Sequence, residues 1–150
     1  MINSALLKIG AGVTTLLAGG SVALLSPSSP AVAYSSPPLF LDVSIQSPAH
    51  LVAKGAAVTI PLTVICTAPS APENFVDVQI TQRSGNKVAS GWDYAYLGCT
   101  GSRQQITITV SAASATRFSK GPAYVTARIV GCTDYFCGQE YNDATIQIVS

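Results

Sequence analysis

The sequence predicts an all-β domain, on the strength of three observations. Apolar residues alternate with polar ones in several segments, which is the period of strands with one buried face. Gly, Pro, Asn and Ser separate these segments, and no stretch shows a comparable helical period. About seven such segments in roughly 110 residues match the count and spacing of an immunoglobulin-like antiparallel β-sandwich, with a barrel as the alternative.

The expected strands follow one another from residue 39 onward. They are expected at 39–45, 58–66, 76–81, 88–96, 106–111, 123–129 and 144–148. Pro61 lies inside the second segment and has no N–H to donate to a neighbouring strand. That strand must therefore bulge at Pro61 or lack a neighbour there, and we expect a bulge.

The N-terminus has the three-part pattern of a secretory signal peptide. One basic residue, Lys8, precedes an apolar run over 9–25, and the small residues Ala31-Val32-Ala33 follow a polar stretch. We expect cleavage after Ala33 and a secreted, extracellular protein. An uncleaved anchor is the alternative, because the apolar run lies at the lower edge of membrane-spanning length. The expected organisation is a signal peptide at 1–33, an extended leader at 34–38 and the β-sandwich domain at 39–150.

The charges after the expected signal peptide are balanced. Of the 8 Lys and Arg residues, Lys8 lies in the signal peptide, which leaves seven cations for 7 Asp and Glu. Such a surface produces no long-range field that would attract nucleic acid or an anionic membrane. We therefore expect a monomer that binds neither nucleic acid nor, once cleaved, a membrane, and that recognises any partner by shape, hydrogen bonds and apolar contact.

Four cysteines in a small secreted domain predict two disulfides, for which three connectivities are possible. Cys66 shares the register of the apolar residues of its strand and should face the core. Cys132 lies opposite the apolar set of its strand and should face away from the core. Only four residues separate Cys132 from Cys137. The simplest pairing is therefore Cys132 with Cys137, and Cys66 with Cys99.

No residue set predicts an enzyme. His50, the only histidine, lies in a Pro-Ala-His-Leu turn, and no Ser lies in a Gly-x-Ser-x-Gly elbow. One histidine and cysteines that secretion favours as disulfides do not complete a four-ligand zinc site. Two carboxylate pairs lie near strand edges, where solvated charges are expected: Glu73 with Asp77, and Glu140 with Asp143. We expect no catalytic site, no metal and no cofactor.

Two aromatic groups are the candidates for binding. Trp92, Tyr94 and Tyr96 occupy alternate positions and share one face of an extended strand. That face is either a stacking platform or, as we favour, a core face in which Trp92 is buried and the tyrosine hydroxyls reach its rim. Tyr135 and Phe136 lie in a loop closed by its own disulfide, where they either contact another molecule or fold over the end of the sandwich. The candidate ligand-binding residues are Tyr135, Phe136, Tyr94 and Tyr96.

Several short motifs resemble those of known families. The strand ending in Cys66, the segment Leu97-Gly98-Cys99-Thr100-Gly101 and residues 118–127 resemble a family of small secreted actinobacterial β-sandwich proteins of unknown function. The Cys132–Cys137 segment, followed by Asn142-Asp143-Ala144, resembles the C-terminal disulfide loop of the enediyne-antibiotic apoproteins, which hold a chromophore in a cleft near that loop. This second resemblance implies only that Cys132 and Cys137 form a structural pair.

These observations lead to a hypothesis about function. We expect a secreted, non-enzymatic domain that binds an extracellular protein or glycan through its loops. One alternative is a small-molecule carrier similar to the enediyne apoproteins, which requires an apolar cleft of about 300 Å³ or more lined by Tyr and Phe. Another is a secreted protease inhibitor, which requires an exposed, extended loop.

Overall fold

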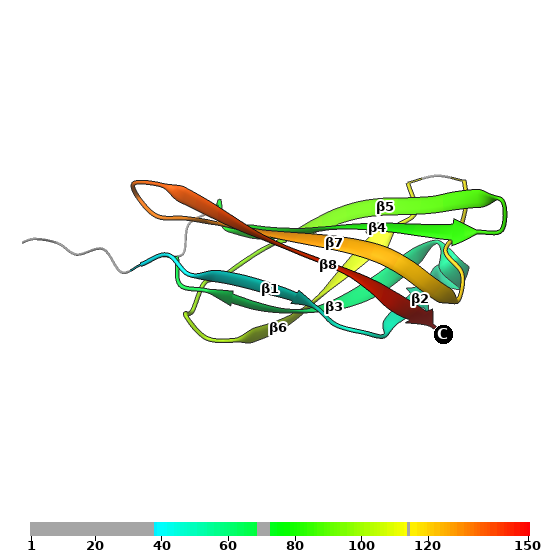
Figure 1. Ribbon diagram of the computed structural model, residues 1–150, viewed down its shortest axis with the longest axis horizontal. Coiled ribbons are helices and arrows are strands. Elements are labelled where there is room, and N and C mark those ends of the chain that lie inside the picture. The colour runs from blue at the N-terminus through cyan, green and yellow to red at the C-terminus, as the bar shows by residue number, and fades with distance from the viewer. Residues whose placement is uncertain (1–37, 69–72, 114) are drawn as a thin grey trace, which may run out of the picture. The chain divides into compact units, whose positions relative to one another are not determined.

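The protein was analysed as a computed structural model that describes residues 38–68, 73–113 and 115–150 (Figure 1). The expected signal peptide and residues 34–37 of the expected leader lie outside the described residues. Within the described ranges, no helix has the length and apolar character needed to cross a membrane.

Eight strands and one short 3-10 turn make up the regular structure of the described residues. They are β1 (Leu41–Ile45), β2 (Ala49–Val52), η1 (Ala53–Gly55), β3 (Ala57–Cys66), β4 (Phe75–Ser84), β5 (Lys87–Tyr96), β6 (Gln104–Ser111), β7 (Gly121–Cys132) and β8 (Cys137–Val149). The expected strands are all present, and β2 is additional. His50 lies in β2, so the expected turn at this residue is wrong. With four residues, β2 is too short to produce a clear alternation in the sequence.

The strands form two layers that are not closed into a barrel (Figure 1). In one layer β3 pairs with β1 and β2 along one edge and with β6 along the other. The second layer has the order β8-β7-β4-β5. All these pairs are antiparallel, and a short parallel pairing of β2 with β8 joins the layers. The predicted immunoglobulin-like antiparallel β-sandwich is therefore confirmed, with eight strands instead of about seven.

The core lies between the layers and consists of the apolar residues predicted from the period-two pattern. Full burial of each such side chain contributes about 1.5–3 kcal/mol. The largest fully buried apolar side chains are Val58, Ile60, Leu62, Val64, Val76, Val78, Ile80, Val110, Val125, Ile129 and Ile148. The residues that alternate with them along the same strands are mostly polar and form the two outer faces.

The expected bulge at Pro61 is wrong. β3 pairs with β6 in unbroken register from Ala57 to Val64, with Pro61 opposite Thr107. Along its other edge, β3 pairs with β2 up to Thr59 and with β1 from Leu62, so Pro61 lies in the gap between those two strands. The Pro61 carbonyl faces this gap and accepts a hydrogen bond from the Gln46 N–H at 2.9 Å. The second possibility considered for Pro61, a missing neighbour, is correct.

Both predicted disulfides are confirmed. Cys66–Cys99 connects the end of β3 to the segment between β5 and β6, with a sequence separation of 33. Cys132–Cys137 joins two directly opposed residues at the end of the β7–β8 hairpin. Cys66 belongs to the hydrophobic core cluster and Cys132 does not, as their parity predicts. Cys132 is nevertheless buried, with an exposed fraction of 7%.

Candidate functional site

The outer face of the β8-β7-β4-β5 sheet carries a group of aromatic and polar side chains. The strand register defines the three rows of this face, in the order β5, β4, β7. The rows are Trp92-Gln79-Thr126, Tyr94-Asp77-Arg128 and Tyr96-Phe75-Val130. On β8, Tyr141 lies opposite Arg128 and extends the middle row. Residues from four separate strands thus meet on one surface.

The preferred placement of Trp92 in the core is wrong, because 58% of Trp92 is exposed. The opposite face of β5 has little room for side chains. A Cβ atom on Gly91 would overlap the Ser111 carbonyl oxygen and lie 2.7 Å from Cγ1 of Val110. β5 therefore crosses the end of β6 in close contact, with small residues such as Ala89 and Gly91 facing inward. The large side chains of β5 are left on the solvent face.

Trp92, Tyr94 and Tyr96 form an aromatic column along β5. The ring centroids of Trp92 and Tyr94 are 5.6 Å apart, with 35° between their planes. Those of Tyr94 and Tyr96 are 5.4 Å apart, and these rings meet edge to face at 89°. A hydrogen bond with Tyr96 is the main cause that raises the pKa of Tyr94 above 10, so Tyr94 is uncharged at neutral pH. The column is therefore a row of three rings whose planes turn along the strand.

Arg128 connects the aromatic column to the polar part of the face. Its guanidinium lies 5.7 Å from the centroid of the Phe75 ring, within the range of a cation–π contact. Its Nε and Nη2 donate to Oδ2 of Asp77 at 2.8 and 2.7 Å. The Asp77 hydrogen bond raises the pKa of Arg128, desolvation opposes this rise, and a hydrogen bond with Tyr141 adds to it. Arg128 is thus held by two residues of β4, Asp77 and Phe75.

Asp77 differs from the solvated charge that the sequence suggested. Its side chain is only 13% exposed, because β4 lies between β5 and β7 and Arg128 covers it. Both Arg128 hydrogen bonds go to Oδ2, which leaves Oδ1 as the carboxylate oxygen available to a further donor. Asp143 also has a partner, since its Oδ2 accepts a hydrogen bond from the Tyr124 hydroxyl at 3.1 Å. This hydrogen bond is the main cause that raises the pKa of Tyr124 above 10.

Two shallow depressions meet at Arg128. The first is lined by the aromatic column together with Phe75 and Arg128, and has a volume of about 250 Å³. The second also has about 250 Å³ and is lined by Asp77, Gln79, Thr126, Ala127, Arg128 and Tyr141, most of which carry polar groups at the ends of their side chains. An aromatic subsite therefore adjoins a hydrogen-bonding subsite on the same face. A larger hollow of about 470 Å³ lies beside Pro61 on the other sheet, but no aromatic residue lines it.

The free edge of β5 is partly blocked. The Ser90 carbonyl points away from β4 and accepts a hydrogen bond from the Ala113 N–H at 2.8 Å. The N–H and C=O groups of successive residues point to alternate edges of a strand. The main-chain groups of Tyr94, four residues after Ser90, therefore point to the same free edge. The Asp93 side chain accepts the Tyr94 N–H at 2.8 Å. A charged side chain at this position disfavours the addition of another strand.

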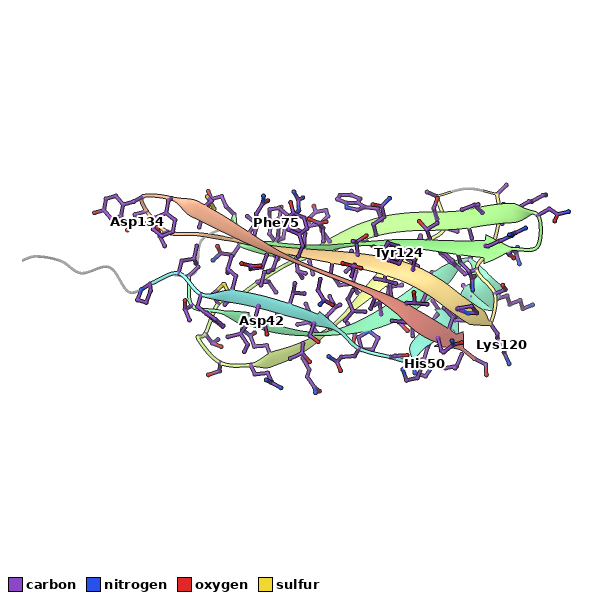
Figure 2. All side chains as sticks on the ribbon, in the orientation of Figure 1. Asp42, His50, Phe75, Lys120, Tyr124 and Asp134 are labelled. Atoms are coloured by element: carbon purple, nitrogen blue, oxygen red, sulfur yellow. A yellow bond between two sulfur atoms is a disulfide. The ribbon has the colours of Figure 1, made fainter. Side chains whose placement is uncertain are left out.

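The second candidate group lies at the tip of the β7–β8 hairpin, where Figure 2 labels Asp134. Tyr135 and Phe136 are 83% and 54% exposed, so they do not fold over the end of the sandwich. The Thr133 hydroxyl accepts hydrogen bonds from the N–H groups of both residues, at 3.3 and 3.2 Å. The loop is therefore locally ordered, but neither aromatic residue lines either of the two depressions at Arg128.

Tyr94 and Tyr96 were predicted from the sequence as candidate binding residues, whereas the residues around them were not. Phe75, Asp77 and Gln79 have the parity opposite to the buried Val76 and Val78, so alternation placed them on an outer face. The alternation did not reveal that Arg128 is two strands away from Tyr94, because strand order is a tertiary property. Among the described residues, no group of three or more His, Cys, Asp and Glu is placed to hold a metal ion. Neither the models of known protein families nor the curated protein sequences match this chain.

Proposed function

We propose that this protein is a non-enzymatic domain that binds a neutral glycan on the outer face of the β8-β7-β4-β5 sheet. The observation that carries the proposal is the aromatic column beside a row of ordered hydrogen-bonding side chains. The two faces of a sugar ring expose C–H groups that stack on aromatic rings, whereas its hydroxyl groups point outward and form hydrogen bonds. A surface for sugars must therefore offer both kinds of contact side by side.

The polar groups of this face suit hydroxyl ligands. Gln79 and Thr126 have side chains that can donate and accept, and Oδ1 of Asp77 can accept a hydroxyl proton. Arg128 is held by Asp77 and Phe75, which lowers the entropic cost of ordering it in a complex. The Asp77 and Arg128 charges offset each other, so the face favours an uncharged partner.

A protein partner is the second candidate, because Trp, Tyr and Arg are frequent in the centres of protein interfaces. Two features favour the glycan. Asp77 and Gln79, next to Tyr94 and Trp92, are polar, whereas interface centres are depleted of charged residues such as Asp77. The Asp93 side chain also blocks the free edge of β5 at Tyr94, where an extended peptide would pair.

This proposal keeps one part of the sequence hypothesis and moves the binding surface from the loops to a sheet face. The carrier alternative loses support, because the aromatic depression is open and smaller than the expected cleft of about 300 Å³. Two disulfides support an extracellular location, since such bonds persist in oxidising compartments. Secretion through the expected signal peptide, and the resemblance to secreted actinobacterial proteins, remain part of the proposal.

Native electrophoresis in gels that contain soluble neutral polysaccharides tests the proposal. A panel of a β-glucan, an α-glucan, a xylan and a mannan covers the common backbones. At least one of them should retard the protein. Trp92→Ala should abolish the retardation with little change in melting temperature, because exposed side chains contribute about 0.5 kcal/mol or less to folding.

The double variant Tyr135→Ala/Phe136→Ala is the matched control and should be retarded like the unaltered protein. Loss of retardation in the loop variant alone would place binding at the hairpin tip and refute the proposed surface. The partner is a protein if no polysaccharide retards the domain, and if the unaltered domain captures a protein from the culture that the Trp92→Ala variant does not capture.

A further inference from the structure

We infer that the ligand is a single glycan chain free in solution, with three successive sugars on the aromatic column, and not the flat surface of a crystalline polysaccharide. The inference rests on the proposed function and specifies the form of its ligand. It follows from the angles between the rings and the position of the polar residues.

The ring planes exclude a flat ligand. Sugars on the surface of a crystalline polysaccharide present parallel faces, and they can stack only on rings that are themselves parallel. The planes of Trp92 and Tyr94 differ by 35°, and those of Tyr94 and Tyr96 by 89°. A free chain can rotate from one sugar to the next and can follow this change of direction.

The spacing of the rings suggests how many sugars bind. Consecutive centroids are 5.6 and 5.4 Å apart, so the column repeats at nearly equal steps. Equal steps suit a polymer with a regular repeat, with one unit on each ring. Three rings therefore accommodate about three units, and further units extend beyond the column.

The polar depression supports a free chain independently of the ring angles. Asp77, Gln79 and Thr126 lie beside the aromatic column and can reach hydroxyl groups along one side of a bound chain. In a crystalline polysaccharide, neighbouring chains occupy those hydroxyl groups.

Trp92 provides the measurement, because it is the only tryptophan of the chain and belongs to the column. Its fluorescence can be titrated with oligosaccharides of one to six units, prepared from whichever polysaccharide retards the protein. Affinity should rise by about tenfold or more from one to three units and change little beyond that. The insoluble, crystalline form of the same or a related polymer should not remove the protein from solution.

Tyr96→Ala removes one ring, preserves the Trp92 signal and should move the plateau from three units to two. Val88→Ala is the matched control, since Val88 is an exposed apolar residue on the same face of β5. A plateau that does not change in Tyr96→Ala overturns the inference. Binding to the crystalline form and not to soluble chains also overturns it but leaves a glycan-binding function in place. If no glycan binds in either form, the proposed function itself fails.

Discussion

The two aromatic groups of this protein differ in what surrounds them. On β5, the register places Trp92 and Tyr94 beside polar residues from β4 and β7, so that aromatic and hydrogen-bonding groups adjoin. At the hairpin tip, Tyr135 and Phe136 are more isolated, although Thr133 and a disulfide order their backbone. Two groups of exposed aromatic residues can therefore have very different surroundings. A sheet face brings distant residues together, whereas a short loop offers only its own residues.

The largest expected effects on stability come from removing the two disulfides, and they should differ in size. Only one of the two disulfides lies at the hairpin tip. Replacing Cys66 and Cys99 by Ala should lower the free energy of unfolding by roughly 4 kcal/mol, and replacing Cys132 and Cys137 by roughly 2 kcal/mol, because the longer loop loses more entropy on closure. Denaturant unfolding of the two double variants checks the order. An equal loss would show that the hairpin disulfide does more than close a short loop.

The next effect tests why the aromatic residues of β5 face outward. Gly91→Val should destabilise the protein by about 3 kcal/mol, because the added side chain would overlap the Ser111 carbonyl and crowd Val110. Gly85→Val is not a suitable comparison, since Gly85 has a positive φ angle of 62°. Gly98 is the control, because its Cβ position is open and its φ is not in the left-handed region. If Gly98→Val and Gly91→Val have similar melting temperatures, the close contact of β5 with β6 does not explain why the aromatic side chains of β5 face solvent.

A buried hydrogen bond ties the hairpin tip to the sheet that carries the aromatic column. The Asn74 side chain is fully buried, and its Oδ1 accepts the Cys132 N–H at 2.8 Å. Asn74→Ala leaves this buried N–H without its acceptor and should cost about 1–3 kcal/mol of stability. Thermal unfolding measures the loss, and hydrogen exchange at Cys132 should accelerate. Unchanged exchange at Cys132 would contradict the assigned role of Asn74.

The aromatic side chains at the hairpin tip should contribute little to the stability of the fold. Tyr135→Ala/Phe136→Ala should change the free energy of unfolding by less than about 1 kcal/mol, because both side chains are exposed. A loss of about 3 kcal/mol would indicate that the two rings cover the core after all. Thermal unfolding of this double variant, which also serves in the electrophoresis experiment, measures the loss of stability and distinguishes the two outcomes.

The smallest expected effect is that of pH on glycan binding. The pKa of Tyr94 is raised above 10 by its hydrogen bond with Tyr96, and that of Arg128 is raised above its usual range by Asp77. Tyr94 therefore keeps its proton, and Arg128 its charge, when the pH rises from 7 to 9. Trp92 fluorescence titrations should give the same affinity at both values and a weaker one only once the pH exceeds the ordinary Tyr pKa of about 10. A fall in affinity between pH 7 and 9 would mean that another group titrates in the site.

Local patterns in the sequence were enough to predict the fold class, seven of the eight strands, most of the core and the disulfide pairing. Each of these depends on alternation or on short separations, which are local properties of a chain. Parity assigned Cys66 to the core and Cys132 to the other side, and four intervening residues were enough to pair Cys132 with Cys137. The same parity showed that Trp92, Tyr94 and Tyr96 share a face, but not which face.

What those residues face, and what lies beside them, depends on the tertiary structure. Trp92 points outward because β5 and β6 approach so closely at Gly91 that no large side chain fits between them. Arg128 reaches Asp77 and Phe75 because β7 lies next to β4, about fifty residues earlier in the chain. Pro61 is accommodated without a bulge because two different strands end on either side of it. Strand order and the distance between layers result from long-range packing, and local alternation carries no information about either.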